Sequence, residues 1–167
     1  MATLTNHLPL AIAEEAVVPE IVNQAVINAP AQRIFAFIEQ AERNVEWVPD
    51  LTRSERLTPG PTRQGSRFRF VTKIAGIPLE STDEVVEYQP GTLIRFASVQ
   101  GVPHAGYWRF EPQPPAPDGT PRTLVTYSMS FDLPPAIGPL VARMINLPTR
   151  LDEQSRACLA NLRSLLE

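Results

Sequence analysis

The chain has 167 residues, of which 43% are hydrophobic and 20% are charged, and its formal net charge is −3. This length fits one domain with one continuous core, and the composition is that of a folded globular protein rather than a disordered chain. Basic and acidic residues are mixed along the sequence, so no basic stripe is present to neutralise phosphates, and we expect no nucleic-acid partner.

Residues 1–20 are predicted to be an N-terminal extension, and residues 21–167 to form the folded domain. The first strand is predicted at 21–28, where apolar and polar residues alternate. Pro30 suits the first turn of a helix, because its missing N–H would be unpaired there in any case. Apolar residues at helical spacing predict that helix over 31–40. A second short helix or turn is predicted at 44–48, before Pro49.

From residue 51 onward, the hydrophobic pattern changes to period two, which is typical of β-strands. The predicted strands cover 51–57, 66–74, 79–88, 93–99, 104–110 and 123–131. Since consecutive strands joined by short turns form hairpins, the sequence predicts one antiparallel sheet with one wet face. The proline-rich segment 112–117 is predicted to be a loop, because proline cannot donate a hydrogen bond to a neighbouring strand.

The C-terminal region returns to helical spacing, with one apolar stripe over 137–145 and a second over 151–166. Pro148 is predicted to kink or interrupt this helix, with Thr149 capping the resumed segment and Asp152 in its first turn. No other element is long enough to cover the apolar face of the sheet. The predicted class is therefore α+β, with a curved antiparallel sheet wrapped around a long C-terminal helix and two short helices after the first strand.

A sheet wrapped around one helix leaves space near the helix ends, and an apolar cavity is expected there. The inward-facing positions supply the candidate ligand-binding residues, which are Phe68, Phe70, Phe96, Trp108, Tyr127, Met129 and Leu159. A buried Tyr127 ring requires a hydrogen-bond partner for its hydroxyl, which a ligand, another side chain or water could supply. Trp47 is interpreted as a structural plug, and Cys158 as an inert buried thiol.

Three residues are candidates for acid–base chemistry: His104, Asp83 and Glu84. His104 begins a strand near the expected cavity mouth, and histidine titrates near neutral pH. The alternative interpretation is a solvent-exposed histidine beside a turn. Asp83 and Glu84 are adjacent on a strand, so one should face inward, where a carboxylate could act as a general acid or base. The neighbouring apolar residues do not settle which one it is, and the alternative is that both are solvated.

Metal and redox chemistry find little support in the sequence. The single cysteine, Cys158, excludes an internal disulfide and a cysteine-based metal site. The two histidines are His7, in the predicted extension, and His104, so we expect no metal and no cofactor. No stretch reaches the ~20 apolar residues of a membrane span, and the N-terminal residues make a poor signal peptide. We therefore expect a cytoplasmic protein.

Five segments of the chain resemble the START-like (SRPBCC) superfamily. These segments are Val26–Phe35, Trp47–Pro49, Val85–Gly91, Tyr107–Pro112 and Gly119–Tyr127. The superfamily includes polyketide cyclases and dehydratases, coenzyme Q-binding proteins, lipid-transfer domains and plant ligand-binding proteins. The resemblance covers residues 21–167 and implies the helix-grip fold with a cavity for a hydrophobic small molecule. It does not imply one chemistry, since one fold hosts many functions.

Two functions are favoured by these observations. The first is the binding of a hydrophobic lipid, quinone or polyketide-like compound, for carriage or sequestration, driven by burial of apolar surface. The alternative is a polyketide cyclase, aromatase or dehydratase in which a cavity carboxylate or His104 moves protons. Whether the chain is an enzyme, and whether it forms a homodimer, are left open. A module that docks a protein partner ranks below both, because no exposed apolar patch is readable from the sequence.

Overall fold

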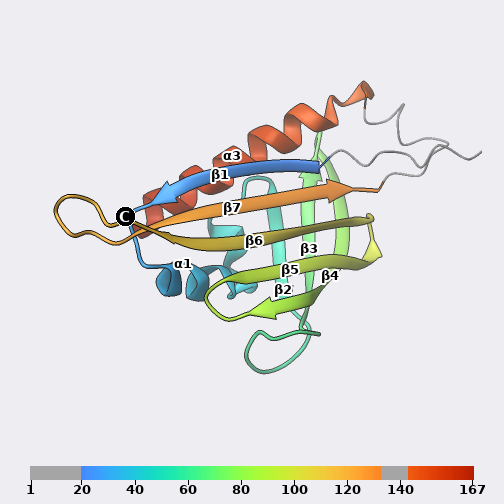
Figure 1. The fold of residues 1–167 in the computed structure, drawn as a ribbon. Coiled ribbons are helices and arrows are strands. Elements are labelled where there is room, and N and C mark those ends of the chain that lie inside the picture. The colour runs from blue at the N-terminus through green and yellow to red at the C-terminus, as the bar shows by residue number, and fades with distance from the viewer. Residues whose placement is uncertain (1–19, 133–142) are drawn as a thin grey trace, which may run out of the picture.

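The structure, a computed structural model, describes residues 20–132 and 143–167, and its elements follow the predicted order (Figure 1). Strand β1 (Glu20–Ile27) is followed by the helix α1 (Ala31–Ile38) and the 3-10 helix η1 (Ala41–Glu46). Six more strands follow, namely β2 (Leu51–Arg56), β3 (Arg67–Ile74), β4 (Ile77–Gln89), β5 (Leu93–Gly101), β6 (His104–Gln113) and β7 (Arg122–Phe131). The last element is the helix α3 (Leu147–Leu166). Apart from Glu20, which opens β1, the predicted extension lies outside the described residues.

All seven strands form one antiparallel sheet in the order β1-β7-β6-β5-β4-β3-β2. Strands β2 to β7 are each paired with their neighbour in sequence, as expected for successive hairpins. The first strand instead pairs along its whole length with β7. Figure 1 shows the sheet curving around the interior, with α3 alongside β1. This arrangement confirms the predicted helix-grip fold.

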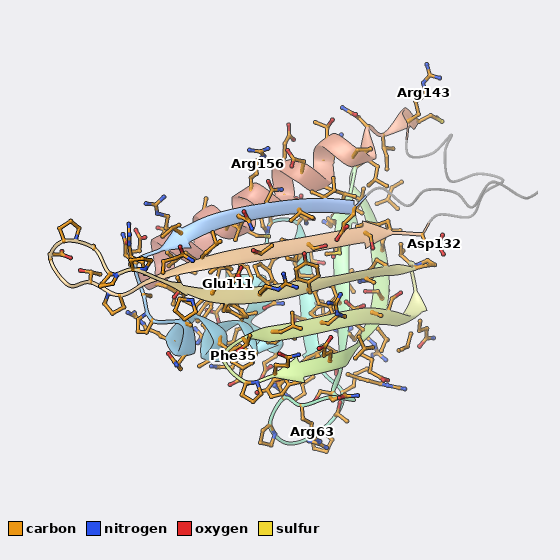
Figure 2. The ribbon with its side chains drawn as sticks, in the orientation of Figure 1. Phe35, Arg63, Glu111, Asp132, Arg143 and Arg156 are labelled. Carbon is orange, nitrogen blue, oxygen red and sulfur yellow. The ribbon has the colours of Figure 1, made fainter. Side chains whose placement is uncertain are left out.

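The core lies between the concave face of the sheet, α1 and α3. Phe35 on α1 packs edge-on against Phe110 and Tyr88, with ring centroids 5.4 and 5.5 Å apart. The buried stripe of α3 consists of Leu147, Leu151, Ser155, Cys158, Leu159, Leu162 and Leu166. Figure 2 shows Phe35 on α1 and Arg156 on the solvent side of α3. No helix within residues 20–132 and 143–167 is long and apolar enough to cross a membrane.

Helix α3 begins after an interruption, as was predicted from Pro148, but its N-terminal cap is not the predicted residue. The N-cap is Asn146, which adopts a left-handed backbone with φ of 51°, and Pro148 lies in the first turn, where no N–H is needed. The prediction of a Thr149 cap was wrong, because Thr149 lies inside the helix and its hydroxyl donates to Asn146 Oδ1. Asp152 lies beyond the first turn and accepts a hydrogen bond from Asn23 of β1. The predicted stripe over 137–145 lies mostly outside the described residues.

The predicted proline-rich loop begins later than expected, because Pro112 is part of β6 and is paired with Thr123 of β7. The backbone N–H of Phe110 donates to Thr92, so the nitrogen of Pro112, two residues on, faces the same side. Strand β5 begins only at Leu93 and has no residue opposite Pro112. The missing N–H therefore removes no hydrogen bond from the sheet.

Candidate functional site

A cavity of about 160 Å³ opens between the concave face of the sheet and η1. Strands β3 to β7 supply most of its wall, and Gln154 is its lining residue from α3. Six of the seven predicted ligand contacts line it: Phe68, Phe70, Phe96, Trp108, Tyr127 and Met129. The alternation along each strand therefore placed these side chains correctly, while their contact with a ligand stays a prediction.

Leu159 was placed in this wall wrongly. It is buried in the core with Cys158 and Leu162 and is not among the residues that line the cavity. The reason is that the middle of α3 packs directly against β1. Helical periodicity identifies which face of α3 is buried, but it does not distinguish burial against the sheet from burial around a cavity.

Aromatic rings form flat surfaces along the cavity wall. The rings of Trp108 and Tyr127 are stacked with centroids 4.0 Å apart and an interplanar angle of 10°. Trp47 meets Trp108 edge-on at 5.7 Å, and Phe68 stacks on Phe70 at 6.3 Å. Trp47, interpreted from the sequence as structural, therefore also lines the cavity. Such surfaces suit planar apolar molecules, because aromatic pairs gain energy from offset and edge contacts.

Asp83 is the carboxylate that faces inward. The hairpin between β3 and β4 turns at Ala75 and Gly76, both with positive φ, as a two-residue turn requires. The resulting register places Asp83 opposite the buried Phe68, and Asp83 is 6% exposed. The alternative that both carboxylates are solvated was therefore wrong. A two-residue turn read from Ala75-Gly76 would have given this register from the sequence.

Glu84 pairs with a cation instead. It lies opposite Arg67 in the register, and the Arg67 Nε donates to its carboxylate at 2.8 Å. Beyond it, a bulge between Val85 and Glu87 reverses the alternation of β4. Val85, two residues beyond Asp83, keeps the alternation and is 4% exposed, whereas Val86 is the extra residue at the bulge and is 38% exposed. Because two adjacent valines lie at this bulge, the apolar residues of the strand did not settle which carboxylate faces inward.

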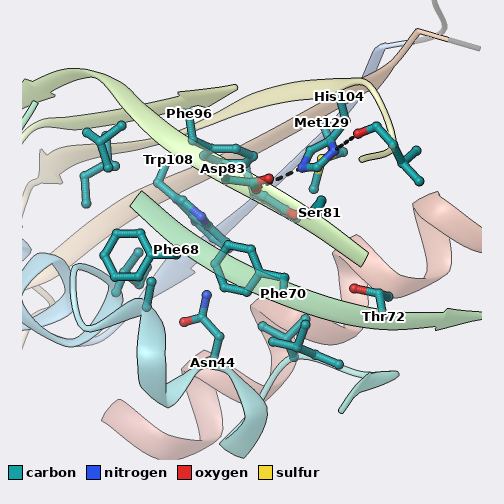
Figure 3. Close-up of a pocket in the computed structure, with 18 of the residues that line it drawn as sticks. Asn44, Phe68, Phe70, Thr72, Ser81, Asp83, Phe96, His104, Trp108 and Met129 are labelled. Carbon is teal, nitrogen blue, oxygen red and sulfur yellow. Dashed lines mark hydrogen bonds and ion pairs between the residues drawn. The ribbon is translucent and has the colours of Figure 1, made fainter. Parts of the chain in front are cut away.

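His104 is buried against Asp83, so the interpretation of a solvent-exposed histidine was wrong. Its backbone N–H donates to Ser98 Oγ at 2.9 Å. Its Nδ1 lies 2.8 Å from the Val102 carbonyl oxygen, and its Nε2 lies 2.9 Å from Asp83 Oδ2 (Figure 3). A carbonyl and a carboxylate only accept hydrogen bonds, so both ring nitrogens donate and the ring is an imidazolium.

The electrostatics of this pair agree with that assignment. Burial by itself lowers the pKa of His104, but the hydrogen bond and the charge of Asp83, together with the Val102 carbonyl, outweigh it. The net result is a His104 pKa above its usual value. His104 and Asp83 therefore form a buried ion pair in the cavity wall, with side chains 9% and 8% exposed.

Stability is expected to fall as the pH rises through the pKa of His104. Because that pKa is raised by folding, the stabilisation is complete below the unfolded value of about 6.5 and is lost above the folded pKa. Each unit of difference corresponds to about 1.4 kcal/mol. Urea unfolding of the wild type and of His104→Gln should show a larger difference in free energy at pH 6 than at pH 9. An equal difference at both pH values would contradict the ion pair.

Several polar groups around the cavity have no hydrogen-bond partner within residues 20–132 and 143–167. Asp83 Oδ1, Trp47 Nε1 and Asn44 Oδ1 are buried and unpaired in this part of the chain. Burial, aided by nearby Cys158 and Asp83, raises the pKa of Tyr127 well above its usual value, so its hydroxyl stays protonated. An unpaired buried group costs about 1–3 kcal/mol unless water or a ligand meets it.

Metal binding and thiol chemistry are not indicated by the described residues. No group of three or more His, Cys, Asp or Glu side chains in the described ranges is arranged to hold a metal ion. Burial raises the pKa of the Cys158 thiol to about 12, so the thiolate is not formed near neutral pH. Among the described lining residues, Asp83, His104 and Tyr127 carry groups that can form hydrogen bonds or exchange protons.

Comparison with known proteins places this geometry in context. Residues 19–167 match a family model described as polyketide cyclase/dehydrase and lipid transport. The aromatase/cyclase Zhui from a Streptomyces species has a similar structure, with a TM-score of 0.71 at 18% identity over 89% of this chain and 93% of its own. A START superfamily protein from Mycobacterium smegmatis gives a TM-score of 0.66 at 16% identity over 88% of this chain and 96% of its own.

A plant protein shares the same architecture. Major latex-like protein 151 from Panax ginseng gives a TM-score of 0.66 at 12% identity, over 90% of this chain and 98% of its own. Comparison with curated protein sequences gave no match. At these identities the structural neighbours show the fold, and the family model carries the classification.

Proposed function

The chain belongs to the polyketide cyclase/dehydrase and lipid transport family, and from this premise we propose that it binds an apolar, ring-containing small molecule for carriage or sequestration. The family and its structural neighbours indicate hydrophobic ligand binding or polyketide cyclase activity. The observation that supports binding is the cavity itself, whose wall is built largely from Phe, Trp, Tyr and aliphatic side chains. Burial of apolar ligand surface against this wall would drive binding.

The cavity volume limits the size of the ligand. About 160 Å³ is room for roughly ten water molecules, since each water needs about 10–15 Å³ of such space. A molecule of one or two fused rings fits this volume, and its faces would lie against the stacked rings of Trp108 and Tyr127. Longer chains would extend through the cavity mouth.

A cavity-filling substitution tests this proposal. Thr72 lines the cavity on β3, whereas Val71, the preceding residue, lies opposite Glu80 in the register and does not line it. Thr72→Phe should weaken binding of 2-methylnaphthalene about tenfold, which corresponds to about 1.4 kcal/mol. Val71→Phe, the matched control, should bind as the wild type does. Isothermal titration calorimetry measures both, and equal affinity in the two variants would contradict binding in this cavity.

A second candidate function is catalysis, and the buried Asp83–His104 pair is the observation that favours it. The sequence-based hypothesis required polar groups converging inside the cavity, and both residues line it. In a dehydration, the free Oδ1 of Asp83 would take a proton from a carbon next to a carbonyl and return it to the leaving hydroxyl, which would depart as water. The pairing with His104 would hold the Asp83 carboxylate in place.

Turnover separates this candidate from binding alone. The wild type should consume a β-hydroxyketone faster than buffer does, and Asp83→Asn should bind it without consuming it. Binding without turnover by the wild type would rule out this chemistry for that substrate and leave carriage or sequestration as the function.

A further inference from the structure

We propose that Asp83 anchors the ligand through a hydroxyl group, and that the cavity selects neutral, hydroxyl-bearing molecules over carboxylic acids. This inference rests on the proposed binding function and names the chemical class of the ligand. It begins from the two oxygens of one buried carboxylate, which have different surroundings. Asp83 Oδ2 is bonded to His104, while Oδ1 is buried without a partner among the described residues.

The free oxygen defines the group that it would bind. A carboxylate oxygen accepts hydrogen bonds and donates none, so its complement is an O–H or N–H donor. A ketone, an ether or an ionised acid offers only acceptors and would leave Oδ1 unpaired. Since Asp83 is 6% exposed, a donor for Oδ1 has to come from within the cavity. A hydroxyl on an otherwise apolar ligand would supply the donor for Asp83 Oδ1 while adding little polar surface to the ligand.

His104 orients the Asp83 carboxylate and has no free ring N–H to offer a ligand. Both of its ring nitrogens are engaged, by Asp83 and by the Val102 carbonyl. Its ring also stacks on Phe131 at 5.5 Å and meets Phe96 edge-on at 6.4 Å. Figure 3 shows Asp83 held between Phe96 and the His104 ring. The imidazolium therefore fixes Oδ2 and leaves no N–H for a ligand anion.

The remaining charges around the cavity are negative. Besides Asp83, its described lining includes Glu39, Glu80 and Glu84, but no lysine or arginine. Glu80 and Glu84 are paired with Arg69 and Arg67, which do not line the cavity. Residues 1–19 and 133–142, outside the described ranges, contain no lysine or arginine either. A carboxylic acid in this cavity would lose its hydration, would lie near the Asp83 carboxylate and would find no unpaired cation in the described lining. Neutral ligands avoid both costs.

A series of three compounds with the same ring system tests the inference. They are 2-naphthol, which has a donor, 2-methylnaphthalene, which has none, and 2-naphthoate, which is an anion. At pH 7, calorimetry on the wild type should show 2-naphthol binding about tenfold more tightly than 2-methylnaphthalene, as expected for a hydrogen bond to a charged acceptor. 2-Naphthoate should bind about tenfold or more weakly than 2-methylnaphthalene.

Asp83→Asn should reduce the advantage of 2-naphthol to about twofold, because a neutral amide is a weaker acceptor than a carboxylate. Its affinity for 2-methylnaphthalene should stay within about twofold of wild type, since that compound makes no polar contact. The matched control is Glu87→Gln, on the same strand, whose carboxylate pairs with Arg95 and does not line the cavity. It should keep the wild-type ratios. If Asp83→Asn does not fold, the three wild-type affinities decide by themselves.

The outcomes separate this inference from the function on which it rests. If 2-methylnaphthalene binds and 2-naphthol binds no better, the anchor is overturned and the binding function stands. Binding of 2-naphthoate as tight as that of 2-naphthol would overturn the selection against acids. If none of the three compounds binds to the wild type, the proposed function itself fails for ligands of this size.

Discussion

Asp83→Ala should lower the free energy of unfolding by about 3–5 kcal/mol, the usual cost of removing one partner from a buried ion pair. The contact between His104 Nε2 and Asp83 Oδ2 is 2.9 Å, and both side chains are nearly inaccessible to water. Without the carboxylate, a cation would be left in an apolar wall, or the ring would have to lose its proton. Urea unfolding at pH 6 measures the loss, and a cost below about 1 kcal/mol would contradict a buried pair.

The same variant should move the pKa of His104. Burial, which lowers that pKa, is opposed in the wild type by the hydrogen bond and charge of Asp83. Removing Asp83 leaves burial opposed by the Val102 carbonyl alone, so the pKa should fall below its usual value of about 6.5. NMR titration of the imidazole ring protons gives this pKa directly. An unchanged pKa would show that Asp83 is not the partner that charges the ring.

A double replacement tests whether the pair is present for stability or for function. Asp83→Leu combined with His104→Phe removes both charges together and leaves no unpaired cation. Because a buried pair replaced by apolar residues often costs little, the double variant should recover most of the stability that Asp83→Ala loses. It should also lose the tenfold preference for 2-naphthol, since the Asp83 carboxylate that accepts its hydrogen bond would be gone.

Gly106→Ala is expected to lower the free energy of unfolding by about 3 kcal/mol, at the upper end for overpacking by one methyl group. A Cβ on Gly106 would lie 2.2 Å from the backbone oxygen of Ser128 and 2.7 Å from the Phe96 ring. Ser128 belongs to β7, paired with β6 along its length, so its oxygen cannot move without disturbing the sheet. The Phe96 ring would have to shift as well, which would deform the cavity wall next to His104.

Gly119→Ala is the control for this prediction. Gly119 has a positive φ of 85°, but nothing lies within 4 Å of its Cβ position, so only backbone strain of about 1–2 kcal/mol is expected. Thermal or urea unfolding compares the two variants. If Gly106→Ala lowers the free energy of unfolding no more than Gly119→Ala does, then β6 and β7 can move apart more easily than their pairing implies.

The strands and most of the cavity wall could be predicted from local sequence. Period-two alternation gives the side on which a residue lies, and that placed Phe68, Phe70, Tyr127 and Met129 on the concave face. The helix boundaries were less accurate, because the cap is set by the left-handed backbone of Asn146 rather than by Thr149. Thr149 was predicted from its residue type, whereas the backbone conformation of Asn146 makes that residue the cap.

The sequence by itself determined the fold class and the apolar wall, because both follow from hydrophobic patterns that repeat over a few residues. Only the tertiary structure decided how Asp83 and His104 pair at the polar end of the cavity. The two-residue turn at Ala75-Gly76 sets which of Asp83 and Glu84 faces inward, and the sheet brings Asp83 to His104, 21 residues away in sequence. Likewise, only the structure shows that α3 buries Leu159 in the core rather than in the cavity wall. Contacts between strands distant in sequence also depend on turn geometry, bulges and the curvature of the sheet, which alternation alone does not specify.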